Sequence, residues 1–143
     1  MKGSGKKIIS DNRKARHEYS IEDDYEAGMV PLGTEVKALR NGQVNLSDSY
    51  AKIVRGEVFV YRMNISPYKF AYYDNHEPLR PRKLQLHNYE IRKLIGKINE
   101  KGYSLIPLSL YFSNGKIKMK LGLARGKKLH DKRHSIKERE AKR

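Results

Sequence analysis

The chain has 143 residues, of which 31 are Lys or Arg and 16 are Asp or Glu, so its formal net charge is +15. This length fits one domain with one core, and the absence of cysteine excludes a disulfide scaffold, thiolate metal sites and thiol catalysis. The apolar runs are far shorter than the roughly 20 residues that cross a bilayer, and the start of the chain has no apolar stretch typical of a secretory signal. We therefore expect a soluble, cytoplasmic protein that binds a polyanion and no membrane. We also expect it to be a monomer.

The excess positive charge is concentrated at the two ends of the chain. Residues 1–16 carry a net charge of +5 and residues 124–143 a net charge of +6, whereas the 107 residues between them carry +4. We therefore divide the chain into a basic, flexible arm over 1–11, a folded domain over 12–123 and a basic tail over 124–143. Such arms are either solvated segments without a partner or segments that become ordered on phosphates. Leu129 and Ile136 are too few apolar residues to bury a face in lipid, which favours nucleic acid.

The first half of the chain predicts several short strands and one short helical turn. In chain order these are a strand over 17–22, a short helical turn over 26–29, and a strand over 33–40 that stops at Asn41-Gly42. Residues 50–54 and 57–65 predict a hairpin that turns at Arg55-Gly56.

The segment 66–83 reads as a long loop that mixes aromatic and basic residues. A loop of this length in a small domain is usually functional or disordered. We expect Tyr68 and Phe70 to cover an open end of the fold. Arg80, Arg82 and Lys83 are better candidates for phosphate contact.

The second half predicts one long helix and one hairpin. Asn88 can cap the helix and Gly102 suits the residue after its end. Apolar residues recur along it at i, i+3, i+4 and i+7: Ile91, Leu94, Ile95 and Ile98. In 116–123 apolar residues alternate with lysines, which predicts a strand with one buried and one cationic face. It pairs with a strand over 104–112 through the turn Ser113-Asn114-Gly115, and Pro107 should lie at an edge or bulge.

Five or six strands with one main helix predict a mainly β protein. We expect an OB-fold-like closed antiparallel barrel with one main helix, short helical turns and a basic C-terminal tail.

The sequence contains no recognisable catalytic constellation. It lacks a phosphate-binding loop, a dinucleotide fingerprint and an HExxH motif. His130 and His134 have helical i, i+4 spacing, but the cations around them disfavour a metal, so we expect no metal and no cofactor. A nuclease with His17 or His130 as the acid–base residue is the enzymatic alternative.

Several stretches, in order, carry a resemblance to a known family. They are NRKARHEY (12–19), YEAG (25–28), GTEVKALR (33–40), NLSDSY (45–50), RKL (82–84), LSLY (108–111), GKK (126–128) and HDKR (130–133). These stretches resemble the motifs of the SmpB family, the bacterial partners of transfer-messenger RNA (tmRNA), from about residue 8 to the end. The resemblance implies an OB-fold barrel that binds the tRNA-like domain of tmRNA. It also implies an adaptor, not an enzyme, that brings aminoacylated tmRNA with elongation factor Tu into the vacant A site of a stalled ribosome.

The resemblance also implies site residues. Positions that match the family's RNA-facing residues are Asn12, Arg13, Lys14, Arg16 and Glu26. Positive charge adds, as our inference, Lys37, Arg40, Arg82, Lys83, Arg125, Lys127 and Lys128.

The tail has its own expected partner. In the family it is disordered in solution and helical in the empty mRNA channel of the ribosome. The motif His130, Asp131, Lys132 and Arg133 then lies near the decoding centre of 16S rRNA. A helix this short and charged should not persist alone in water, which agrees with folding on a polyanionic partner.

The resemblance implies no RNA-binding role for some positions. Gln85 stands where the family often has an apolar residue, and Tyr72 and Tyr73 lie in a variable stretch. The tail is shorter than in many relatives. The main alternative is a generic OB-fold protein that binds single-stranded RNA or DNA, which a basic barrel alone would also suggest.

Overall fold

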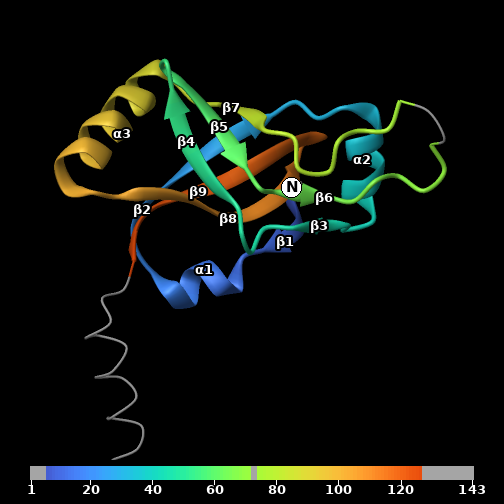
Figure 1. The fold of residues 1–143 in the computed structure, drawn as a ribbon, viewed down its shortest axis with the longest axis horizontal. Helices are drawn as coiled ribbons and strands as arrows, with labels where there is room; N and C mark the ends of the chain where they lie inside the picture. Colours follow the sequence, from blue (N-terminus) through green and yellow to red (C-terminus); the bar gives the residue numbers. More distant parts are fainter. Residues whose placement is uncertain (1–5, 72–73, 127–143) are drawn as a thin grey trace, which may run out of the picture.

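The computed structural model describes residues 6–71 and 74–126. Three helices and nine strands follow one another in this part of the chain (Figure 1). They are β1 (Lys6–Asp11), α1 (Arg13–Glu18), β2 (Tyr19–Met29), α2 (Gly33–Arg40), β3 (Val44–Asn45), β4 (Tyr50–Val54), β5 (Glu57–Tyr61), β6 (Asn64–Ile65), β7 (Arg82–Gln85), α3 (Asn88–Lys101), β8 (Ser104–Ser113) and β9 (Lys116–Gly126).

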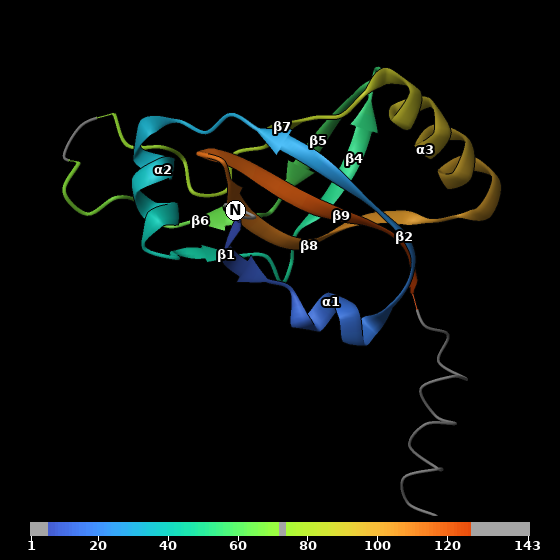
Figure 2. The same ribbon diagram turned by 180° about the vertical axis from the view of Figure 1, so that it is seen from behind.

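The strands form a ring. β8, β4, β5, β7, β2 and β9 pair in that order, and pairing between β8 and β9 closes the ring. β1 adds to β8, and β3 and β6 form a separate two-stranded sheet. α3 and α2 lie at opposite ends of the ring, with α1 beneath it (Figures 1 and 2). The prediction of a mainly β protein with one main helix is confirmed.

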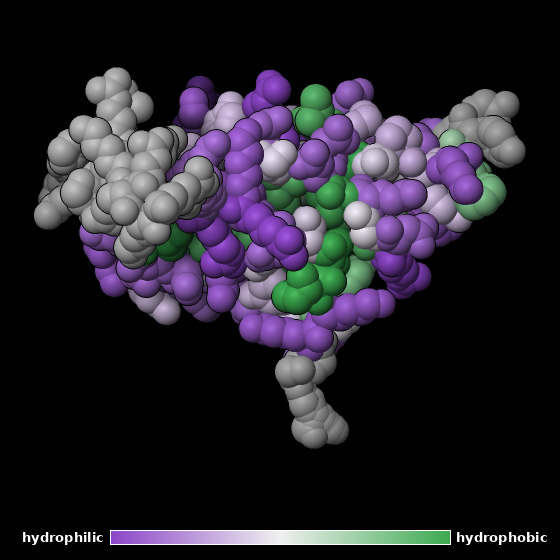
Figure 3. Space-filling model, turned by 90° about the horizontal axis from the view of Figure 1, so that it is seen from below, coloured by the Kyte–Doolittle hydropathy of each residue, from purple (hydrophilic) through white to green (hydrophobic). Residues whose placement is uncertain are grey.

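The core fills the inside of the ring. Alternate residues of the strands point inward, as Ala27 and Met29 of β2 and Met119 and Leu121 of β9 show. A smaller cluster lies under α1, where Ala15 packs with Ile106, Leu108 and Ala124. From below, polar side chains cover most of the surface, with apolar ones gathered toward its middle (Figure 3).

Both predicted hairpins and the predicted long helix are confirmed. The turns contain Arg55-Gly56 and Asn114-Gly115, and all four residues have the positive φ that such turns require. A bulge lies beside Pro107 in the β8–β9 pairing, as expected for a residue without an N–H.

The start of α3 differs in one detail. Asn88 is its first residue rather than its cap, and the Glu90 carboxylate accepts a hydrogen bond from the His87 N–H. Gly102 ends the helix in the left-handed conformation, as predicted.

The segment 33–40 was predicted as a strand, and this prediction is wrong. It forms helix α2, which buries Glu35, Ala38 and Leu39 on one side. These positions have i, i+3, i+4 spacing, the helical period. Because Glu35, the first residue of this buried stripe, is polar, the apolar residues of the segment alone resemble the alternation typical of a strand.

Three other boundaries differ from the prediction. In the segment 17–22, the first two residues end α1 and the strand begins at Tyr19. Residues 26–29 continue that strand rather than forming a helical turn. The strand expected over 57–65 is broken at Arg62, which has a φ of 59°, and its end pairs with β3 instead of β4.

Regular structure also reaches into the segments expected to be basic arms. β1 lies within the predicted arm over 1–11, and β9 continues to Gly126, beyond the predicted strand over 116–123. The pairing of β1 with β8 and of β9 with β2 holds these residues on the ring.

The long loop before β7 is held by its own side chains. Asn75 hydrogen-bonds the backbone N–H and C=O of Tyr68, and the His76 ring lies between Thr34 Oγ1 and the Ile65 carbonyl. Phe70 is 63% exposed, so the prediction that it covers an end of the fold is wrong. Tyr72 and Tyr73 lie outside the described residues.

Candidate nucleic-acid interface

The outward side of β2 and β9, which lie side by side in Figure 2, carries a row of lysines that we call the β2–β9 face. It consists of Glu26, Lys116, Lys118 and Lys120, together with Tyr111 of the adjoining β8. The apolar residues of β9 point into the core, so strand alternation places the lysines on the outer side. Glu26 pairs across the strands with Lys120, which brings a carboxylate into the row of lysines.

Tyr111 positions Glu26 within this face. Its hydroxyl donates a hydrogen bond to Glu26 Oε2, and the Lys6 ammonium lies 4.8 Å from the centre of the tyrosine ring. Burial and the neighbouring Glu26 carboxylate raise the pKa of the Tyr111 hydroxyl far above its ordinary value. The hydroxyl therefore stays protonated and acts as a donor that holds the carboxylate in place.

A groove continues the β2–β9 face toward α2. Its volume is about 770 Å³. Lys7, Arg40, Lys116 and Lys118 are the charged residues among those that line it, and Met29 is among its apolar ones. A concave surface whose lining, among the residues that the structure describes, has cations and no carboxylate attracts a polyanion.

A buried ion-pair network holds α2 against the ring. Glu35 is fully buried and accepts hydrogen bonds from the Leu32 N–H, from Arg80 at 2.7 and 3.0 Å, and from Arg82 Nε at 2.6 Å. Burial by itself would raise the pKa of the Glu35 carboxyl, but the hydrogen bonds from Arg80, Leu32 and Arg82 outweigh it and the pKa is lowered. The network thereby sets where the cations of α2 stand.

Arg82 is part of this network and not of the surface. Its side chain is 1% exposed, and its other nitrogens donate to the carbonyls of Met63, Glu77 and Pro78. Its guanidinium is thus fully engaged inside the protein. This placement corrects the expectation that Arg82 contacts RNA, which rested on charge alone.

Asn12 is likewise an internal residue. It is 3% exposed, and its amide donates to the carbonyls of Leu46 and Pro107 while its oxygen accepts from the Ala15 N–H. These bonds cap α1 and join it to β8 and to the segment after β3. Asn12 therefore orients α1, and its side-chain amide is engaged inside the protein rather than on the surface.

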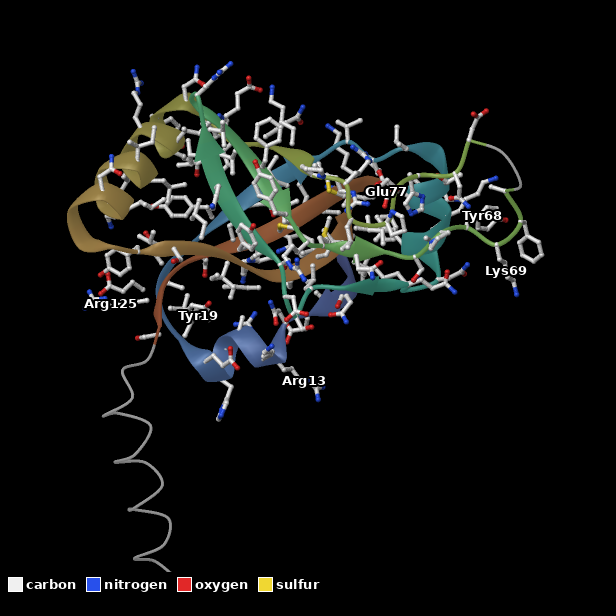
Figure 4. All side chains as sticks on the ribbon, viewed as in Figure 1. Arg13, Tyr19, Tyr68, Lys69, Glu77 and Arg125 are labelled. Carbon is white, nitrogen blue, oxygen red and sulfur yellow. The ribbon has the colours of Figure 1, made fainter. Side chains whose placement is uncertain are left out.

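In contrast to Asn12, the Arg and Lys residues of α1 are exposed. Arg13 points away from the body of the protein (Figure 4). Lys14 and Arg16 each lie 3.3 Å from a surface carboxylate, that of Asp48 and that of Asp11. Exposed pairs of this kind contribute little to stability, so the cations can exchange their partners for phosphates.

The remaining predicted residues are spread over the surface. Lys37 and Arg40 are exposed on α2, Lys83 on β7 pairs with Glu57 at 2.6 Å, and Arg125 ends β9. α1 and α2 lie apart in both ribbon views, so the predicted cations do not form one cluster (Figures 1 and 2). Outside the described residues lie Lys127, Lys128, His130, Asp131, Lys132 and Arg133.

Sequence reasoning missed Tyr111 and assigned no binding role to the β9 lysines. The signal for the lysines was present in the alternation over 116–123, which predicts a cationic face. Tyr111 belongs to the motif LSLY (108–111), but the motif did not reveal its role, because that role depends on the Glu26 carboxylate, 85 residues away in the sequence.

Within residues 6–71 and 74–126, no group of three or more His, Cys, Asp or Glu residues is placed to hold a metal ion. His17, the base of the nuclease alternative, is exposed at the end of α1. None of the described helices is long and apolar enough to cross a membrane.

Comparison with known proteins gives one consistent answer. The model of the SmpB protein family matches residues 9–143. The SsrA-binding proteins of Geobacillus thermodenitrificans and Bacillus subtilis are each 57% identical over 142 residues, which is 99% of this chain and 91% and 90% of theirs. A chain in a solved structure described as "tmRNA-SmpB: a journey to the center of the bacterial ribosome" is 48% identical, with a TM-score of 0.70 over 84% of this chain and 85% of that one.

Proposed function

The chain belongs to the SmpB protein family, and from this premise we propose that it is an RNA-binding adaptor of trans-translation. It binds the tRNA-like domain of tmRNA and delivers that RNA to ribosomes stalled without a stop codon. The observation that carries the proposal is the near full-length similarity to SsrA-binding proteins and to a tmRNA–SmpB complex. The cationic β2–β9 face supports it independently, because a fold with this surface is suited to RNA.

The β2–β9 face is the part of the surface that we assign to the tRNA-like domain. Lys118 and Lys120 can neutralise phosphates, which provides most of the affinity for RNA. Glu26, held by Tyr111, can accept hydrogen bonds from base amino groups or ribose 2′-hydroxyls, which adds selectivity. Because the Glu26 carboxylate is a fixed acceptor within a row of cations, this face can bind a folded RNA in preference to another polyanion of the same charge.

Exposed cations among the predicted site residues serve as further phosphate contacts beyond this face. They are Arg13, Lys14, Arg16, Lys37, Arg40 and Lys83. We assign Asn12 and Arg82 an indirect part, in which they position α1 and α2 without touching RNA.

Three finer statements belong to the same proposal. The ring of strands is of the OB type, which the mainly β order and the family membership support. The protein acts in the cytoplasm, where ribosomes translate. It enters the ribosome together with elongation factor Tu through the aminoacylated tmRNA.

A binding competition tests the proposal. We expect the tRNA-like domain to bind far more tightly than an unstructured RNA of equal length at physiological salt. The double variant K118E/K120E should lose at least tenfold in affinity and show a lower salt slope, since about two phosphate contacts disappear. The matched control R92E/K93E reverses two exposed cations of α3 that lie outside the face, and it should lose much less. Equal affinity for both RNAs would leave only the generic single-strand alternative.

The tail motif needs a separate test, because it lies outside the described residues. We expect His130→Ala and Asp131→Ala to leave the affinity for tmRNA unchanged but to block peptide tagging in a reconstituted translation assay with a stalled ribosome. Loss of tmRNA affinity with either change would show that the tail takes part in the first binding step.

A further inference from the structure

A second groove lies between β4, the C-terminal half of α3 and the start of β8, and we call it the β4–α3 groove. Its volume is about 700 Å³. It exists because β4 pairs with β8 at a single residue pair, Ala51 with Leu105, so the two strands diverge beyond that point. Ile95 and Ile98 of α3 are partly buried and form part of its floor.

Three tyrosines line this groove. Tyr50 stacks on Tyr61, with ring centres 5.5 Å apart and planes at 21°, so its ring is held in one orientation. Tyr103 is only 5% exposed and belongs to the core, and Arg125 Nη2 donates to its hydroxyl at 2.8 Å, so it forms part of the groove wall rather than an open ring surface. Tyr19 stands at the start of β2, next to the end of β9 that carries Arg125 (Figure 4).

The charge at the groove has one sign. Lys52 and Arg55 are the charged residues among those that line it, and both are exposed. None of the described lining residues is acidic. Arg125 adds a third cation against the lining residue Tyr103, with its guanidinium carbon 4.9 Å from the ring centre.

We propose that the β4–α3 groove binds unpaired nucleotides of single-stranded RNA, as a second RNA site distinct from the β2–β9 face. The partly exposed rings of Tyr19 and Tyr50 provide surfaces on which bases stack, and the cations at the rim, including Lys52 whose ammonium lies 5.5 Å from the Tyr50 ring centre, neutralise the connecting phosphates. The volume is within the range of about 300–1,000 Å³ typical of sites for small ligands, which suits one or two nucleotides. Charge complementarity selects a polyanion over an apolar peptide, and the tyrosines select bases over a bare phosphate.

The two RNA sites can be occupied at the same time. The residues that line the β4–α3 groove and those that line the groove beside α2 have no member in common. α3 and α2 also lie at opposite ends of the ring (Figures 1 and 2). One folded RNA on the β2–β9 face therefore leaves the β4–α3 groove open for a strand of another RNA.

The experiment uses the full chain and a fluorescent six-nucleotide uridine RNA with one 4-thiouridine. Its affinity is measured by anisotropy at physiological salt, with and without saturating tRNA-like domain. We expect binding to persist when the tRNA-like domain is bound, and photocrosslinks to map to peptides that contain Tyr19 or Tyr50. The variant K52E/R55E should lose at least five times more affinity than the matched control R92E/K93E. Because all four residues are exposed, both variants should unfold in urea like the wild type.

Each of three other results would overturn the proposal. The first is displacement of the six-nucleotide RNA by the tRNA-like domain, or crosslinks that avoid the groove. The second is a difference below fivefold between the two charge-reversal variants, since general attraction to a basic protein would then account for binding. The third is concentration-dependent dimerisation that K52E/R55E abolishes in sedimentation, which would assign the groove to a second copy of the chain.

Discussion

The substitution Glu35→Gln removes the negative charge that Arg80 and Arg82 share inside the fold. Glu35 is 0% exposed and Arg82 is 1% exposed, whereas Arg80 is 30% exposed. After the change, Arg80 can rehydrate, but the Arg82 guanidinium stays buried without a counter-charge. The amide also turns a donor toward groups that are themselves donors.

The cost follows from this difference in burial. Removal of one partner of a buried ion pair destabilises a protein by roughly 3–5 kcal/mol. We therefore expect Glu35→Gln to lower the free energy of unfolding by about 3–5 kcal/mol. Arg80→Met should cost only about 1–2 kcal/mol, because Arg80 is partly solvated and Glu35 keeps its bonds to Arg82 and Leu32. The double variant E35L/R82M should cost less than the sum of its single variants E35L and R82M, since E35L alone leaves the buried Arg82 charge unpaired and the double variant does not.

Urea unfolding followed by circular dichroism measures these values, and equal slopes against urea would show that the denatured states are comparable. The effect should also depend on pH. The pKa of Glu35 is lowered from its ordinary value of 4.5, so the carboxylate stabilises the fold fully above about pH 4.5 and loses this contribution as the pH falls through the folded-state pKa. The difference in the free energy of unfolding between the wild type and Glu35→Gln should therefore decrease at acidic pH. A cost below 1 kcal/mol at pH 7, or a double variant as unstable as the sum of its two single variants, would refute the reasoning.

Two further substitutions test the placement of the candidate interface. Asn12→Asp keeps the oxygen that accepts from the Ala15 N–H but loses the donors to the Leu46 and Pro107 carbonyls, so the free energy of unfolding in urea should fall by about 2–4 kcal/mol. The control Arg13→Ala beside it should change stability by less than about 0.5 kcal/mol. An equal effect of both changes would mean that Asn12 does not hold α1 in place. Tyr111→Phe removes the donor to Glu26 and should weaken binding of the tRNA-like domain a few-fold in anisotropy. Because the folded-state pKa of Tyr111 is raised, the wild type should lose stability as the pH rises above about 10, and Tyr111→Phe should lose less over that range; parallel pH profiles would contradict this.

Local chemistry in the sequence was enough to predict several elements of the fold. Asn-Gly is a favoured pair for the positive φ of a two-residue hairpin turn, so Asn114-Gly115 predicts its turn locally, and Arg55-Gly56 adopts the same conformation with Gly56 at its second position. The stripe of α3 repeats at the helical period and needs no partner to be recognised. The lysines of 116–123 alternate with core residues, so their outward direction also follows from the sequence.

The tertiary structure decided which polar residues face RNA and which are internal. Arg82 and Lys83 are neighbours in the sequence, yet the first is buried on Glu35 and the second is exposed. Glu35 looks like a surface residue, and its burial is possible only because Arg80 and Arg82 reach it from 45 and 47 positions away. Asn12 depends in the same way on carbonyls distant in the sequence.

What the sequence by itself determined is therefore the family, the basic character and the elements with strong local signals. What only the tertiary structure decided is the composition of each surface. The β2–β9 face combines Glu26, Lys120 and Tyr111 because strand register places them side by side, and the β4–α3 groove opens because β4 leaves β8 after one residue pair. Charge and residue type are properties of single positions, whereas burial and partnership are set by long-range pairing.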